Sequence, residues 1–128
     1  MKKPTVIMIS VEKGGTGKTT VALELCSTFG KDYKVLGIDL DPQMNLTMYA
    51  GADEKTGKTL KNVLDADILI EDSIQHLKDF DLIPGDKKLA NASKLYGDAD
   101  DIYLLKDALD DINDYDFIFL DSAPARSP

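Results

Sequence analysis

The chain has 128 residues, of which 43% are hydrophobic and 30% charged, and this composition is typical of one soluble globular domain. Its formal net charge of −8 disfavours non-specific binding to DNA or anionic membranes by this chain alone, because both depend on basic residues near phosphates. Cys26 is the only cysteine, which excludes an internal disulfide and a cysteine-only zinc site. Since we find no signal-like N-terminus and no long apolar run, we expect a cytoplasmic protein without a membrane partner.

The expected elements alternate between strands and helices along the chain. Short apolar runs rich in β-branched residues predict buried strands over residues 5–10, 34–40, 80–84 and 116–121. Apolar residues at helical spacing predict helices over residues 18–30 and 101–113, and shorter ones over 59–66, 71–79 and 86–97. The alternation predicts an α/β fold, with a parallel sheet of about four strands and helices on both faces. We expect one domain over residues 1–128.

A glycine-rich segment, "EKGGTGKTT" (residues 12–20), joins the first predicted strand to the first predicted helix. Helix N-termini offer unpaired N–H groups and positive dipole charge, and glycines let the backbone turn its N–H groups toward a phosphate. Lys18 can then reach the β- and γ-phosphates of a nucleotide, and the Thr19 hydroxyl can bind Mg²⁺. Glu12 stands where the usual phosphate-binding loop begins with glycine, and a second lysine, Lys13, follows it.

Acidic residues follow two of the predicted strands. In "DLDPQMNLT" (residues 39–47), Asp39 ends the second strand, on the side where open α/β sheets bind ligands. It can hold a Mg²⁺-bound water, and Asp41 can orient the attacking water or accept its proton. The same residues also fit a strand that ends in a solvated Asp-Pro turn. In "YDFIFLDSAP" (residues 115–124), Asp121 ends a Walker B-like strand and is placed to hold Mg²⁺ through water.

Together these segments resemble the ParA/MinD family of P-loop ATPases, whose deviant Walker A motif is usually K-G-G-V-G-K-T-T. Here Thr16 replaces the valine within residues 13–20. The pattern D-x-D-P-Q-x-N-x-T, which residues 39–47 match at each specified position, favours the ParA branch. Residues 80–90 also resemble the family's third strand and the helix after it, so that the likeness covers essentially the whole chain.

The resemblance implies ATP and Mg²⁺ as cofactors and assigns roles to particular residues. Lys13 resembles the signature lysine that reaches the ATP of a second subunit, and Asp41 resembles the residue that positions water. Thr19, Asp39 and Asp121 resemble the Mg²⁺ groups, with Asp39 in the outer shell. The nucleotide-binding residues implied by the motif are Gly14, Gly15, Thr16, Gly17, Lys18, Thr19 and Thr20.

The resemblance further implies a partition ATPase that dimerises with ATP and drives plasmid or chromosome segregation. Its implied partners are a second copy, a centromere-binding protein and non-specific DNA. Members of that family are longer, and the half absent here supplies further strands and the basic DNA-binding surface. We therefore expect residues 5–10 to form an apolar sheet edge that is covered by self-association or strand exchange. The alternative is an inactive nucleotide-binding module that caps full-length relatives.

Four remaining residues carry weaker signals. His76 is the lone histidine and lies in a polar helical segment, so we expect no metal or catalytic role for it. Cys26 falls on the apolar face of the first helix and is expected in the core. Met44 and Met48 fit either packing or a partner surface.

Overall fold

The computed structural model describes residues 3–9, 18–89 and 99–122 of the chain. Its strands in the described part are β1 (Thr5–Ile9), β2 (Val35–Asp39), β3 (Gln75–His76), β4 (Asp81–Ile83) and β5 (Phe117–Asp121). Its helices there are α1 (Lys18–Gly30), α2 (Asn45–Tyr49), α3 (Leu60–Leu64), α4 (Ile70–Ser73) and α6 (Ala99–Asp110).

The strands form one sheet in the order β1-β5-β2-β4-β3. The pairs β1–β5, β5–β2 and β2–β4 are parallel, and the short β3 pairs antiparallel with β4. The α/β class and the parallel sheet predicted from the sequence are therefore confirmed. β1 pairs with β5 along its whole length.

The strand β3, which we did not predict, lies within residues 71–79, where we predicted a helix. Only α4 is helical there, and β3 follows it at once. The side-chain amide of Gln75 accepts a hydrogen bond from the Asp53 N–H group and donates one to the Asp53 carbonyl oxygen, both at 2.8 Å. These contacts, together with pairing to β4, favour the extended conformation over the helical one. The helix predicted over residues 86–97 lies largely outside the described residues.

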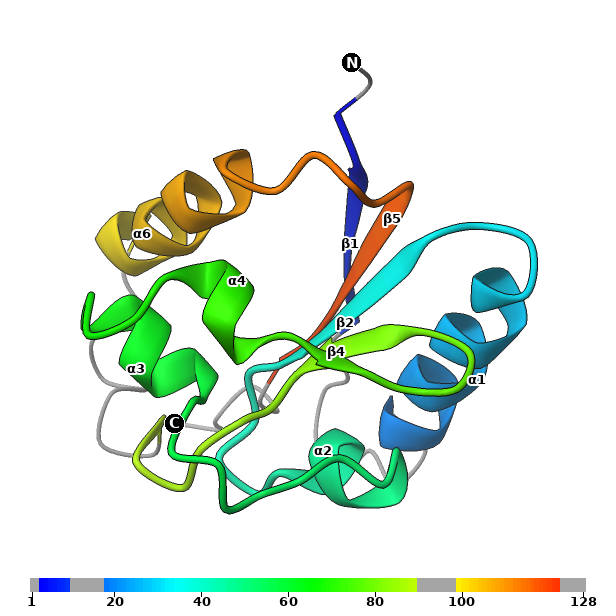
Figure 1. Cartoon of the computed structure of the whole chain (residues 1–128), viewed down its shortest axis with the longest axis horizontal. Coiled ribbons are helices and arrows are strands. Elements are labelled where there is room, and N and C mark those ends of the chain that lie inside the picture. The colour runs from blue at the N-terminus through cyan, green and yellow to red at the C-terminus, as the bar shows by residue number, and fades with distance from the viewer. Residues whose placement is uncertain (1–2, 10–17, 90–98, 123–128) are drawn as a thin grey trace.

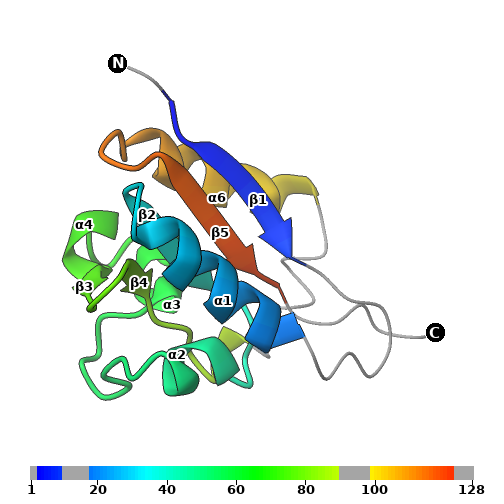
Figure 2. The ribbon, with the colours of Figure 1, turned by 90° about the vertical axis from the view of Figure 1, so that its right-hand side faces the viewer.

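Helices cover both faces of the sheet, as Figures 1 and 2 show: α1 and α2 lie on one face, and α3, α4 and α6 lie on the other. β2 and β5 contribute side chains to the hydrophobic core on each face of the sheet, because successive side chains of a strand point to opposite faces. Phe119 of β5 packs with the α1 layer, whereas Ile118 and Leu120 pack with the α6 layer. The predicted burial of these two strands is confirmed.

Small side chains on α1 face the sheet. Ala22 and Cys26 are fully buried, which confirms the predicted core position of Cys26. Burial, with a smaller contribution from the charge of Asp121, raises the pKa of the Cys26 thiol to about 12. Val21, also in α1, is exposed. α1 ends at Gly30, as predicted, where a Cβ atom would lie 2.0 Å from the carbonyl oxygen of Asp79.

β1 forms one edge of the sheet and is less buried than we predicted. Ile7 and Ile9 pack against the α1 layer. Val6 and Met8 point to the other face, where they are 47% and 52% exposed. The prediction that both faces of this strand are buried is wrong, because the described helices on that face do not cover β1. The predicted apolar edge is confirmed.

No helix within the described ranges is long and apolar enough to cross a lipid bilayer.

Candidate functional site

The carboxyl ends of three parallel strands lie level with one another. Asp121 of β5 is in register with Ile9 of β1 on one side and with Asp39 of β2 on the other. The backbone N–H and the hydroxyl of Ser122 donate to the Ile9 carbonyl oxygen at 3.2 and 2.9 Å, which ties the end of β5 to the end of β1. We call this side of the sheet the carboxyl edge.

The first turn of α1 also lies at the carboxyl edge. α1 begins at Lys18, and the hydroxyl of the buried Thr19 donates to Oδ2 of Asp121 at 3.4 Å. Thr20, in contrast, is exposed. The structure thus brings two of the predicted Mg²⁺ residues, Thr19 and Asp121, together although they are 102 positions apart in the sequence.

Asp39 is fully buried and accepts three hydrogen bonds. Its Oδ1 accepts the N–H of Asp41 at 3.1 Å, and its Oδ2 accepts the N–H and the hydroxyl of Thr47 at 3.0 and 2.6 Å. Burial raises the pKa of Asp39 to about 6, the bonds from Thr47 and Asp41 oppose that rise, and the charge of Asp121 adds to it. Neutral hydrogen-bond donors therefore stabilise the ionised carboxylate of Asp39, but they only partly offset the cost of its burial.

Asp41 lies in a tight turn between β2 and α2. Its Oδ1 accepts the N–H of Gln43 and its carbonyl oxygen accepts the N–H of Met44, each at 2.9 Å. Met44 adopts a left-handed conformation with φ of 59°, which is unusual for a residue other than glycine, and its side chain is buried. Of the two methionines, Met44 therefore packs inside, while Met48 is exposed. Because Asp41 is itself buried, the solvated Asp-Pro turn does not describe this segment.

Two residues at this edge were missed by the sequence interpretation. Thr47 was matched only as a motif position, and Gly85 was not singled out. The Thr47 hydroxyl accepts the N–H of Gly85 at 2.9 Å, and a Cβ atom on Gly85 would lie 3.1 Å from Cγ of Asp39. The Pro-Gly pair directly after a predicted strand was the available signal, since glycine there permits close approach to the neighbouring strand end.

The donor set at this edge fits Mg²⁺. Hydroxyl and carboxylate oxygens are the ligands that this hard cation prefers, and it usually keeps several waters and phosphate oxygens around one or two protein ligands. In the described part of the chain no group of three or more His, Cys, Asp or Glu residues is arranged to hold a metal alone. The arrangement therefore suits a metal that arrives with phosphate better than an all-protein metal cage.

The remaining predicted nucleotide residues lie outside the described residues. These are Gly14, Gly15, Thr16 and Gly17, and the predicted catalytic lysine, Lys13, lies outside the described residues too. Their segment connects two described points, the end of β1 at Ile9 and the start of α1 at Lys18.

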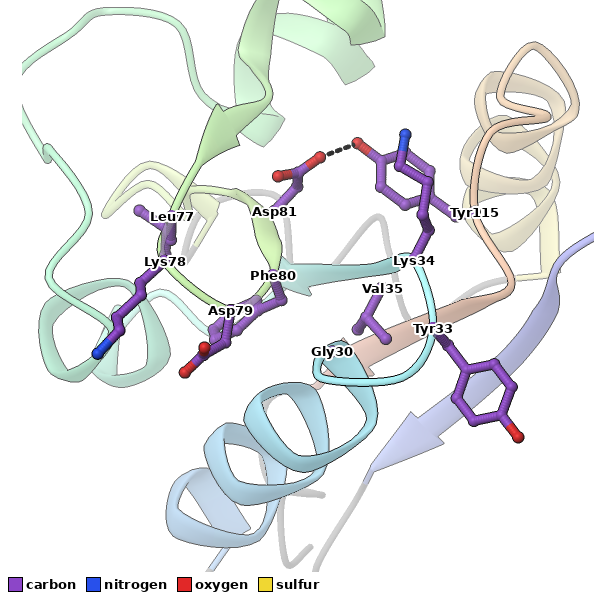
Figure 3. A pocket seen from close by; sticks show the side chains of 10 residues that line it. All are labelled: Gly30, Tyr33, Lys34, Val35, Leu77, Lys78, Asp79, Phe80, Asp81 and Tyr115. Atoms are coloured by element: carbon purple, nitrogen blue, oxygen red, sulfur yellow. Dashed lines mark hydrogen bonds between the residues drawn. The ribbon is translucent and has the colours of Figure 1, made fainter.

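A hollow of about 190 Å³ lies at the opposite side of the sheet, where β2, β4 and β5 begin (Figure 3). We call this side the amino edge. Oδ2 of Asp81 accepts the hydroxyl of Tyr115 at 2.6 Å, and Oδ1 of Asp81 lies 2.9 Å from Nδ1 of His76. Burial, followed by the hydrogen bond and charge of Asp81, raises the pKa of the Tyr115 phenol. His76, for which no functional role was predicted, is thus an exposed partner of Asp81.

A parallel α/β sheet with acidic residues at the carboxyl edge, next to the first turn of a helix, defines a nucleotide-binding class of fold. Residues 4–127 match a family model described as an AAA domain. The chain belongs to this family, within its ParA-like group, as the resemblance of the three motifs had indicated.

Relatives and solved structures share this architecture. The chain is 33% identical to the chromosome-partitioning ATPase Soj of Thermus thermophilus over 95% of this chain and 47% of Soj. It is 35% identical to the maintenance of carboxysome distribution protein A of Gloeothece citriformis over 94% of this chain and 49% of that protein. The chain thus spans about half the length of the curated relatives it matches.

Two solved structures show nucleotides in neighbouring proteins. The ATP complex of an aspartate-to-alanine variant of McdA from Cyanothece matches with a TM-score of 0.87 and 31% identity, over 98% of this chain and 50% of that one. The cobyrinic acid a,c-diamide synthase of Mycobacterium smegmatis, with bound ATP analogue and magnesium, matches with a TM-score of 0.81 and 30% identity, over 95% of this chain and 52% of that one.

Proposed function

We propose that this chain binds ATP with Mg²⁺ at the carboxyl edge and belongs to a ParA-type partition ATPase. The observation that carries the proposal is the contact between the Thr19 hydroxyl and Asp121, at the point where β2 and β5 end level with each other. ATP complexes of related chains support the choice of nucleotide. The bound analogue and magnesium in the diamide synthase support the choice of metal.

The proposed phosphate contacts come from the segment between β1 and α1. The N–H groups of Gly14, Gly15 and Gly17 would bind phosphate oxygens, and Lys18 would balance their charge. Thr16 in the loop and Thr20 in the first turn of α1 are the other proposed nucleotide residues. With Mg²⁺ bound, Thr19 would supply a hydroxyl ligand, and Asp121 and Asp39 would accept hydrogen bonds from water molecules of the metal. The Mg²⁺ ion, when bound, withdraws charge from the β- and γ-phosphate oxygens.

Hydrolysis in this proposal depends on two further groups. The Asp41 carboxylate positions the attacking water, and the bond from the Gln43 N–H group fixes the orientation of that carboxylate. Lys13 approaches the ATP of a second subunit, so that its charge stabilises the transition state only in a dimer. The rate per chain is then expected to rise with protein concentration, and a concentration-independent rate would contradict the role of Lys13 in trans.

The same relatives support a proposed biological role. We propose a cytoplasmic protein whose nucleotide state controls dimerisation and the segregation of plasmid or chromosomal DNA. The name of Soj, a chromosome-partitioning ATPase, supports the segregation role. A centromere-binding protein would stimulate hydrolysis, and non-specific DNA would serve as the track. Self-association through the β1 edge stays a prediction, and a strictly monomeric chain in dilute sizing experiments would count against it.

The first experiment measures nucleotide affinity. Wild-type protein is titrated with ATP, ADP and GTP, with and without Mg²⁺, by calorimetry. We expect ATP to bind more tightly in Mg²⁺ than in EDTA, and the Lys18→Ala variant to lose most of that affinity. Equal binding with and without the metal would contradict the proposed contribution of Thr19 and Asp121.

The second experiment separates an enzyme from an inactive module. Lys18→Ala and Asp41→Ala are each expected to abolish Mg²⁺-dependent ATP hydrolysis. A wild-type chain that binds ATP without turnover, alone and with DNA, would instead favour the module that caps longer relatives.

A further inference from the structure

The end of β2 is held by a residue that the proposed function does not use. Thr47 lies in α2, eight positions after Asp39, and both side chains are fully buried. Its hydroxyl donates to Oδ2 of Asp39 at 2.6 Å, and its N–H group donates to the same oxygen at 3.0 Å. A distance of 2.6 Å is typical of a strong hydroxyl–carboxylate bond. The two bonds orient the carboxyl from one side.

The Thr47 hydroxyl also receives a hydrogen bond. The N–H of Gly85, which follows β4, donates to it at 2.9 Å. One hydroxyl therefore joins the end of β2, the helix α2 and the segment after β4, because a hydroxyl can donate and accept at once. A side chain at position 85 would press on Asp39, since an added Cβ would lie 3.1 Å from its Cγ and 3.2 Å from its Oδ2.

The opposite oxygen of Asp39 connects this cluster to Asp41. Oδ1 of Asp39 accepts the Asp41 N–H at 3.1 Å. The orientation of Asp39 therefore sets the backbone position from which the Asp41 carboxylate extends. We propose that Thr47 is a positioning residue: its hydroxyl, anchored on Gly85, fixes Asp39 and through it the turn that carries Asp41. This inference rests on the proposed function for its effect on hydrolysis, but the hydrogen-bond link itself can be tested without nucleotide.

The experiment compares three variants of the whole chain. Thr47→Val removes the hydroxyl at nearly constant volume, and Thr47→Ser keeps it. Thr59→Val is the matched control: Thr59 is also buried, and its hydroxyl contacts Asn62 and Asp86 at 2.9 and 2.8 Å, without contact to Asp39 or Asp41. For each variant we would measure kcat, ATP affinity, the free energy of unfolding and amide hydrogen exchange at Asp41 and Gly85.

We expect Thr47→Val to lower kcat about tenfold or more, because a misplaced general base loses part of its effect. One hydroxyl hydrogen bond is worth about a factor of ten, and the ATP affinity of Thr47→Val should change less than its kcat. Thr47→Ser keeps the hydroxyl, so its kcat should stay within about threefold of the wild type. Thr59→Val should lose stability without this fall in kcat. Equal kcat values for Thr47→Val and Thr59→Val would overturn the inference.

Hydrogen exchange separates this inference from the proposed function. In nucleotide-free protein, exchange at the Gly85 and Asp41 amides should be about tenfold faster in Thr47→Val than in Thr59→Val, because the lost hydroxyl frees the first amide and loosens the acceptor of the second. A wild-type chain without turnover would refute the proposed hydrolysis, and exchange would then decide the positioning link alone. Unchanged exchange at both amides would overturn that link whatever the activity.

Discussion

At the carboxyl edge, Asp39 is fully buried and takes its hydrogen bonds from backbone N–H groups and a hydroxyl, whereas at the amino edge Asp81 pairs with an imidazole and a phenol. The side chain of His76 is 80% exposed, so that the amino edge opens to water beside the hollow in Figure 3. At each edge the buried or half-buried carboxyl group has hydrogen-bond partners. They differ in that one partner of Asp81, the His76 imidazole, can carry positive charge, while the donors of Asp39 are neutral.

This difference indicates which edge is suited to bind a cation. Burial and, to a smaller extent, the charge of Asp121 raise the pKa of Asp39 to about 6, so ionisation of this carboxyl is less favourable in the fold than in water. A cation that reaches the carboxyl edge would relieve this cost, because an opposite charge favours the ionised carboxyl. Perturbed acids at a strand end of an α/β sheet are typical of functional sites. This contrast supports the proposed site at the carboxyl edge, and we expect the amino edge to contribute to stability.

The largest expected effect separates the two edges by activity. Asp41→Asn should lower kcat about 10²–10⁴-fold, because the amide cannot accept a proton from water. Asp81→Asn, the same change at the amino edge, should leave kcat within about threefold, since Asp81 is remote from the proposed chemistry. Steady-state ATP hydrolysis checks both variants, and comparable losses would break the distinction between the edges.

The next effect is on pH-dependent stability without Mg²⁺. The pKa of Asp39 rises from 3.8 to about 6 on folding, so the folded state holds the proton more tightly. This contribution to the free energy of unfolding is complete below pH 3.8 and is lost as the pH rises through about 6. The difference corresponds to about 3 kcal/mol.

Urea unfolding in EDTA between pH 3.5 and 7, on the order of one measurement per half unit, checks this slope. Asp39→Asn should flatten the decline because the titrating group is gone, and Asp81→Asn should retain it. Saturating Mg²⁺ and ATP should also flatten it if the metal site is adjacent. A decline that survives in Asp39→Asn would assign it to other groups.

Two glycines test the edges by packing. A Cβ on Gly30, which lines the hollow at the amino edge, would meet the Asp79 carbonyl oxygen at 2.0 Å, so Gly30→Ala should cost about 1–3 kcal/mol of stability. A Cβ on Gly85 would approach Asp39 less closely, so Gly85→Ala should lower stability less than Gly30→Ala does, but it should lower activity more. Thermal unfolding and kcat for the two variants should therefore rank in opposite orders.

The smallest effect concerns the phenol at the amino edge. Tyr115→Phe removes the 2.6 Å hydrogen bond to Asp81 and should lower the free energy of unfolding by about 1 kcal/mol. ATP hydrolysis should be unchanged. A clear loss of activity would mean that the amino edge is coupled to the proposed site, and this would contradict a purely stabilising role for the amino edge.

Much of the fold could be predicted from local patterns. β2 and β5 are short apolar runs buried on both faces, and α1 matches its predicted limits because a glycine closes it. The convergence of Asp39 and Asp121 follows from the same patterns, since parallel strands end at one edge. Register was the part that the sequence left open, and the structure places these two residues directly opposite each other.

Other features depend on contacts between distant segments, which local patterns do not contain. The extended conformation of Gln75 depends on Asp53, 22 positions away, and this overrides the helical spacing of residues 71–79. The link between Thr47 and Gly85 spans 38 positions, and a glycine after a strand does not specify the partner that it approaches. The exposure of Val6 and Met8 depends on which elements cover β1, and no local pattern of the strand can specify its neighbours.

The residues of α1 that face the sheet have one more consequence. Thr19, Ala22 and Cys26 are spaced three and four positions apart, all three are buried, and α1 packs on β5 and β2. Short side chains allow the helix axis to approach the strands closely, and this proximity lets a hydroxyl on its first turn reach Asp121. The spacing between α1 and the sheet thus determines the span between the Thr19 hydroxyl oxygen and Oδ2 of Asp121. Enlarging Ala22 would push the helix outward and widen that span without touching any polar group.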